Sequence, residues 1–130
     1  MTTLEELQKI ARDMAVQTSY DTPYVLGLEG DLGAGKTTFA QAFIATLDPT
    51  AIVTSPTFSI VQYYDRGRIA HYDLYRIKHS DELFDLDLEE DVLSKICLIE
   101  WPQILKEIGW KIPTLIIPNR NSLCKIFEKN

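Results

Sequence analysis

The chain has 130 residues, 45% of them apolar and 25% charged, which is ordinary for a globular protein and predicts one domain spanning residues 1–130. The net charge of −6 and the pI near 4.8 argue against a chain that grips nucleic acid alone, because such binding needs a basic face. An acidic protein of this kind can still act on RNA beside a basic partner.

Targeting and redox features point to the cytoplasm. No run of about 18 apolar residues is present, so we expect no membrane span. The first residues carry acids and lack the basic-then-apolar pattern of a secretion signal. Cys97 and Cys124 show no metal-ligand spacing, and His71 and His79 do not complete a zinc set with them, so we interpret both cysteines as reduced, buried thiols.

The N-terminal segment predicts a helix and then a strand. Residues 3–17 place apolar side chains on one helical face, and Thr3 with Glu6 forms a capping box. This helix is either a cover for the core or a contact for a nucleotide base, and the first is the simpler interpretation. After a polar turn at 19–22, the apolar run 24–29 predicts the first strand.

A glycine-rich loop follows that strand and fits G-x-x-x-x-G-K-[ST], the phosphate-binding pattern of P-loop proteins. Its glycines let successive backbone N–H groups point at phosphate oxygens, while Lys36 adds a positive charge and Thr37 offers a hydroxyl to Mg²⁺. Residues 38–47 then predict a helix, whose N-terminus favours anions. The candidate phosphate-binding residues are Gly30, Asp31, Leu32, Gly33, Ala34, Gly35, Lys36, Thr37 and Thr38.

A β-rich region comes next, where a simple α/β repeat would place a helix. Residues 51–54 predict a short strand that ends at the bend around Pro56. Two further β-like runs, 58–64 and 69–75, are separated by the turn signal of 65–68 and predict an antiparallel hairpin.

The second half of the chain predicts alternating helices and strands. Residues 80–95 are acidic and mostly helical, with Leu83, Phe84 and Leu86 as core contacts; seven of the eleven residues from 81 to 91 are acids, which is typical of a solvated face or of a surface that docks a basic partner. The apolar run 96–99 predicts a buried strand that ends at Glu100. A short helix over 103–108 and two strands, 114–118 and 123–127, complete the chain.

Four side chains are candidates for phosphoryl-transfer chemistry beyond the loop. Thr37 can supply one magnesium ligand, and Glu100 another, because ligands bind at the carboxyl ends of strands in open α/β sheets. Thr57 and Asp73 are candidates to hold or orient water near the γ-phosphate. Exposure of Asp73 on an open sheet face is an equally good explanation of that acid.

Four motifs carry a family resemblance, in order and at suitable intervals. They are the loop Gly30–Thr38, then Ser-Pro-Thr-Phe at 55–58, His-Tyr-Asp-Leu-Tyr-Arg at 71–76 and Ile-Glu-Trp-Pro at 99–102. The series closely resembles the TsaE family, small bacterial ATPases of tRNA threonylcarbamoyladenosine synthesis, and the match spans roughly residues 4–102.

The resemblance implies an α/β fold, a P-loop NTPase-like, mainly parallel sheet with helices on both faces and an inserted antiparallel hairpin. It also implies ATP and Mg²⁺ as cofactors, weak hydrolysis, and work in a complex with TsaB and TsaD, through which tRNA is reached indirectly. By position it implies that Thr37 and Glu100 ligate magnesium, that Asp73 is needed for activity and that Trp101 lies near the nucleotide. An N-terminal threonine near the adenine corresponds to Thr2 or Thr3, while Arg120 lies in a tail that matches the family loosely.

Two other function classes need the same loop. One is a protein-binding module in which ATP fixes the shape of a docking surface and hydrolysis is incidental. The other is a small-molecule kinase, which needs an arginine-bearing lid that the sequence does not show.

Overall fold

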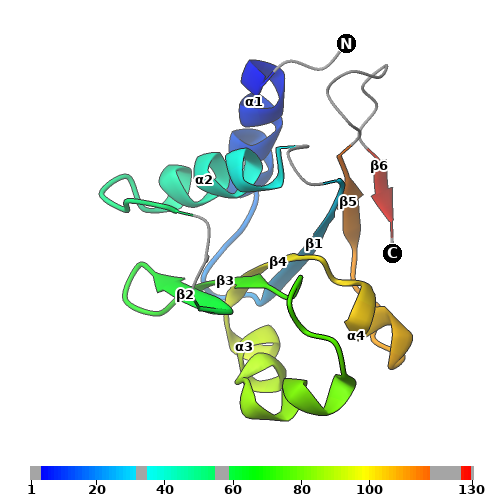
Figure 1. The fold of residues 1–130 in the computed structure, drawn as a ribbon. Helices are drawn as coiled ribbons and strands as arrows, with labels where there is room; N and C mark the ends of the chain where they lie inside the picture. Colours follow the sequence, from blue (N-terminus) through cyan, green and yellow to red (C-terminus); the bar gives the residue numbers. More distant parts are fainter. Residues whose placement is uncertain (1–3, 32–34, 55–58, 118–126, 130) are drawn as a thin grey trace.

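A computed structural model describes residues 4–31, 35–54 and 59–117, and the backbone of 127–129. Six strands form one sheet in the order β2-β3-β4-β1-β5-β6 (Figure 1). The four inner strands run parallel, and the two edge strands pair antiparallel with their neighbours. The fold class predicted from the sequence, a mainly parallel α/β sheet with an inserted hairpin, is therefore confirmed.

The central strands form where the sequence is continuously apolar. β1 (Tyr24–Glu29) and β4 (Ile96–Glu100) pair in parallel over five residues, and β4 is buried along its whole length. Strands buried on both faces need apolar residues at every position, because each face meets a helix layer. β5 (Thr114–Ile116) pairs on the other side of β1, and β6 (Phe127–Lys129) lies outside it.

One face of the sheet carries the first two helices. α1 (Leu4–Ala15) packs against α2 (Lys36–Leu47), and both cover β1, as Figure 1 shows. The apolar face predicted for the N-terminal helix is buried at Leu7 and Ala11. Phe39 and Phe43 of α2 are fully buried and their rings stack.

The other face carries shorter elements. A 3₁₀ helix, η1 (Ser80–Asp85), leads into α3 (Leu88–Ser94). α4 (Gln103–Glu107) lies on the same face of the sheet (Figure 1). The second core cluster joins these elements to alternate residues of β3 and β4, such as Tyr72 and Ile99. Two apolar clusters thus hold one sheet from both faces.

The predicted hairpin is confirmed with shorter strands. β2 (Val61–Tyr64) and β3 (Ile69–Asp73) pair antiparallel through a turn whose residues Asp65, Arg66 and Gly67 have positive φ angles. β3 also pairs in parallel with β4, so the inserted hairpin extends the sheet next to the strand that ends at Glu100.

Several sequence expectations are wrong. Residues 51–54 form no strand, and Ile52 is 87% exposed; the side chain of Gln41 donates to the Val53 carbonyl instead of a strand neighbour. Phe84, expected in the core, is 83% exposed, while Asp91, expected on a solvated face, is buried. The final strand covers 127–129 in place of 123–127, of which 123–126 lie outside the described residues.

Candidate functional site

The start of α2 brings the predicted loop lysine to the carboxyl end of the sheet. Lys36 is the first residue of the helix and only 5% exposed. Its Nζ donates to the carbonyl oxygens of Gly30, at 2.6 Å, and Asp31, at 2.9 Å. A buried ammonium held this close to the loop backbone is placed to receive an anion at the helix N-terminus.

Gly35 has a conformation that only glycine adopts cheaply. Its φ angle is 112°, in the left-handed region, and a Cβ atom here would lie 2.7 Å from Cδ2 of Leu7 on α1. The backbone at Gly35, one residue before the lysine, therefore lies directly against the first helix.

Two carboxylates meet the lysine from neighbouring strands. Asp73 ends β3, Glu100 ends β4, and the two residues are direct partners in the parallel register. Neighbouring strands lie roughly 4.8 Å apart and partners share a face, so both side chains project on the α2 side of the sheet. The sequence predicted both acids as site residues, and the structure brings them together with Lys36.

His71 completes this group, and sequence reasoning missed it. Its ring is fully buried, and Nε2 lies 2.6 Å from a carboxylate oxygen of Glu100. Nδ1 has no hydrogen-bond partner among the described residues. The available signal was its spacing: His71 lies two residues before Asp73 on one strand, so both project from the same face.

Burial and neighbouring charges shift the pKa values of Lys36 and Asp73 in different directions. Burial lowers the pKa of Lys36, and the charges of Glu100 and Asp73 oppose that shift. Burial also raises the pKa of Asp73, and the neighbouring Glu100 raises it further, while the Tyr75 backbone N–H, which donates to Asp73 at 3.0 Å, works in the other direction. Perturbed groups of opposite and like charge in one place are characteristic of functional sites.

Trp101 borders the lysine from the strand that carries Glu100. Its φ angle is 58°, a left-handed value that is uncommon for a bulky residue, and its backbone N–H donates to the Leu28 carbonyl. The indole ring lies 4.2 Å from Nζ of Lys36 and contacts the ring of Tyr75 at 4.8 Å between centroids. The strained turn thus holds an aromatic surface beside the charged group.

The remaining predicted site residues divide into two groups. Gly30, Thr37 and Thr38 are half-buried beside the helix start, and Asp31 is exposed. Leu32, Gly33, Ala34, Thr57, Thr3 and Arg120 lie outside the described residues, so their predicted roles stay predictions.

The oxygen donors at this edge of the sheet suit Mg²⁺, which keeps water and phosphate ligands, better than a metal ion that is bound entirely by protein side chains. No group of three or more His, Cys, Asp or Glu side chains within the described ranges could hold a metal ion. Mg²⁺ usually takes one or two carboxylates and completes its shell with water and phosphate oxygens. The carboxylate of Glu100 and the hydroxyl-bearing Thr37, one residue after the lysine, fit that mode.

The sheet order, the helices on both faces and the loop at the β1–α2 junction define an α/β protein with a P-loop NTPase-like fold. The family model described as "Threonylcarbamoyl adenosine biosynthesis protein TsaE" matches residues 1–123. The chain therefore belongs to the TsaE family, whose members act in tRNA threonylcarbamoyladenosine biosynthesis.

Individual relatives agree with this assignment. The chain is 39% identical over 136 residues to the tRNA threonylcarbamoyladenosine biosynthesis protein TsaE of Rickettsia conorii, covering 97% of this chain and 75% of that protein. It is 33% identical to the TsaE protein of Aquifex aeolicus, covering 96% of this chain and 91% of that one. The crystal structure of YdiB from Bacillus subtilis superposes with a TM-score of 0.65 at 34% identity, covering 91% of this chain and 73% of that one.

None of the helices within the described residues is long and apolar enough to cross a membrane.

Proposed function

We propose that this chain binds ATP with Mg²⁺ at the β1–α2 junction and hydrolyses it weakly in support of the TsaB and TsaD proteins, which modify tRNA. The observation that carries the proposal is the convergence of Lys36, Asp73 and Glu100 at the carboxyl end of adjacent parallel strands. Ligands bind at that edge in open α/β sheets. The motif order and the family membership support the same function.

Each residue of the group has a role that its position allows. Lys36 would exchange its contacts with the Gly30 and Asp31 carbonyls for phosphate oxygens and neutralise their charge. Thr37 and Glu100 would hold Mg²⁺, which supplies neutralisation of charge on the phosphates. His71 would fix the orientation of Glu100, because its Nε2 donates to one oxygen of that carboxylate and leaves the other for a ligand.

Asp73 is the group best placed to orient water. Its carboxylate accepts a hydrogen bond from the Tyr75 backbone N–H, and burial raises its pKa, which makes the carboxylate a stronger proton acceptor. Trp101 would offer its ring beside the phosphates. Thr57 and Thr3 enter the proposal on their sequence motifs alone, the first as a γ-phosphate sensor and the second as a contact to the adenine.

Calorimetry and phosphate release test the proposal directly. We expect Mg²⁺-dependent binding of ATP by the full chain, slow release of phosphate when it acts alone, and stimulation by TsaB and TsaD. Absence of Mg²⁺-dependent binding both with and without these partners would overturn it.

Two variants separate the alternatives. Lys36→Ala and Asp73→Ala are both expected to abolish hydrolysis. If Asp73→Ala released phosphate at the normal rate yet failed to support tRNA modification, the protein would be a nucleotide-dependent binding module. Transfer of phosphate to a metabolite would identify a kinase.

A further inference from the structure

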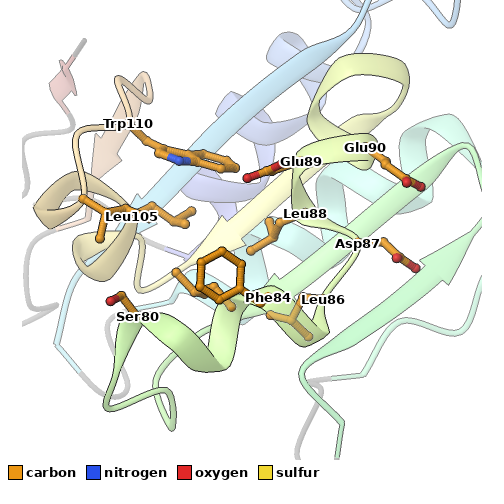
Figure 2. Close-up of a pocket in the computed structure, with 11 residues that line it drawn as sticks. Ser80, Phe84, Leu86, Asp87, Leu88, Glu89, Glu90, Leu105 and Trp110 are labelled. Atoms are coloured by element: carbon orange, nitrogen blue, oxygen red, sulfur yellow. The ribbon is translucent and has the colours of Figure 1, made fainter.

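A second hollow lies on the face of the sheet opposite α2, away from the lysine and its carboxylates. It has a volume of about 460 Å³ and is bounded by η1, α3 and the segment from α4 to Trp110. Figure 2 shows Phe84 between Leu105 and Trp110 on one side and Leu86 and Asp87 on the other. We refer to it as the α3–α4 groove. The residues that line it are Ser80, Leu83, Phe84, Leu86, Asp87, Leu88, Glu89, Glu90, Leu105, Ile108 and Trp110.

The floor and one rim of the groove are apolar. Leu83, Leu88 and Leu105 are buried and form its floor, whereas Phe84 and Ile108 are 83% and 47% exposed. Moving a phenylalanine side chain out of water stabilises a structure by roughly 1.5–3 kcal/mol, which this chain forgoes at Phe84. Exposed aromatic and aliphatic groups around an apolar floor are characteristic of interaction surfaces.

The polar residues of the groove carry a single sign of charge. Asp87, Glu89 and Glu90 are acidic and exposed, and none of the eleven lining residues is Lys, Arg or His. The acids belong to the stretch 81–91, which holds seven of the 19 acids of the chain. An occupant with positive charge beside its apolar groups is favoured, whereas phosphate-bearing surfaces of nucleic acid or anionic lipid are repelled.

The lining also argues against a small-molecule ligand. Such sites place a few buried polar groups around an apolar cavity to fix the orientation of the ligand. In this groove every polar residue, Ser80 included, is exposed at the rim. The walls are helices, not the unpaired edge of a strand, so an added β-strand has no backbone to pair with.

We propose that the α3–α4 groove docks one amphipathic helix of a partner protein, with apolar side chains at i, i+3 or i+4 and i+7 and with lysine or arginine on its flanks. The apolar anchors seat on Leu83, Leu88 and Leu105 beside Phe84. The basic flanks meet Asp87, Glu89 and Glu90. The proposal is separate from nucleotide binding, because the groove shares no residue with the group around Lys36.

Three synthetic peptides test the proposal on the full-length chain. The first is a fluorescent helix of about 18 residues built from leucine, alanine and lysine, with leucine on one face. The second has glutamate in place of lysine, and the third keeps its composition but scatters the leucines around the helix. Anisotropy is expected to show saturable binding of the first peptide, at least tenfold weaker binding of the other two, and the same affinity with and without MgATP.

Matched variants locate the binding site. Phe84→Ser is compared with Ile52→Ser, since both side chains are more than four-fifths exposed but only Phe84 lines the groove. Glu89→Lys with Glu90→Lys is compared with Glu5→Lys with Asp21→Lys, which makes the same charge change at exposed sites elsewhere. We expect each groove variant to weaken binding about tenfold and each control to change it less than twofold.

The outcomes are decisive in both directions. Equal losses in groove and control variants would show nonspecific charge attraction and overturn the proposal, as would equal binding of the acidic or scattered peptide or no saturable binding at all. Because the measurement needs no nucleotide, a chain that failed to bind ATP would leave this test unaffected. Circular dichroism confirms that each variant is folded, as expected for substitutions at exposed positions.

Discussion

Two buried carboxylates, one on each face of the sheet, have opposite surroundings. Asp91 and Glu100 are each 3% exposed. Asp91 accepts hydrogen bonds from the hydroxyls of Tyr63, at 2.7 Å, and Tyr72, at 2.5 Å. Glu100 bonds to His71 and faces a second carboxylate and a lysine. An acid with two neutral donors is typical of a group that stabilises the fold, whereas an acid among opposed charges is characteristic of functional sites.

The largest effect is expected from a substitution in the charged group around Glu100. Lys36→Ala should weaken MgATP binding at least about 100-fold, because it removes charge-assisted hydrogen bonds to phosphate. Calorimetry measures the loss, and Lys9→Ala is the control, since Lys9 is exposed and pairs with Asp13 on α1. Retention of full affinity by Lys36→Ala would contradict the assignment of the site.

The next largest effect is expected from removing Asp91, the acceptor of the two tyrosine hydroxyls. Asp91→Ala should lower the free energy of unfolding by about 2 kcal/mol, because the buried Tyr72 hydroxyl loses its acceptor. Urea denaturation measures it, with the exposed neighbour Glu90→Ala as control. MgATP affinity should stay unchanged in the folded variant; a large change in affinity would mean that the two faces are coupled.

A pair of glycines sharpens the comparison at the loop. At Gly109 the φ angle is 98° and an added Cβ atom would have no neighbour within 4 Å, so Gly109→Ala should lower the free energy of unfolding by about 1 kcal/mol through backbone strain alone. Gly35→Ala has a similar φ angle but also meets Leu7, so it should cost at least about twice as much. Equal unfolding free energies for the two variants would show that the contact with α1 is relaxed without cost.

The smallest effect is a pH dependence at Asp73. Its folded pKa is raised by burial above the ordinary value of 3.8, so the folded protein holds this proton more tightly than the unfolded chain. The associated stability is complete below about pH 3.8 and is lost as the pH rises through the folded value. Without nucleotide, Asp73→Asn should therefore gain stability relative to the wild type between pH 4 and pH 7, as urea denaturation at each pH measures. A constant difference across that range would contradict the raised pKa.

Much of the fold could be predicted from continuous local patterns. The strand expected over 24–29 has those bounds, and the run before Glu100 is buried as expected, because an apolar run in a parallel sheet is nearly unambiguous. The hairpin followed from two β-rich runs and a turn. Lys36 was predicted as a site residue from the loop motif, Glu100 from the apolar run before it and Asp73 from the family resemblance, and the structure places all three at one edge of the sheet.

The parts that could not be predicted depend on partners distant in the chain. Asp91 accepts hydrogen bonds from Tyr63 on β2 and Tyr72 on β3, which lie 28 and 19 residues earlier in the sequence. No local sequence pattern predicts these contacts or the burial of Asp91. His71 acquires its role from Glu100, 29 residues later. Residues 51–54 have strand-like composition but no neighbouring strand to receive their backbone hydrogen bonds, so composition alone did not decide.

Leu7 lies so close to Gly35 that the first helix and the backbone leading into α2 are packed as one unit. A larger residue at 35 meets both this side chain and a φ angle of 112°, so a smaller residue at position 7 relieves the clash but leaves the backbone strain. If the loop binds nucleotide as proposed, a tag, truncation or neighbouring protein that shifts α1 will change nucleotide affinity without touching the binding residues themselves.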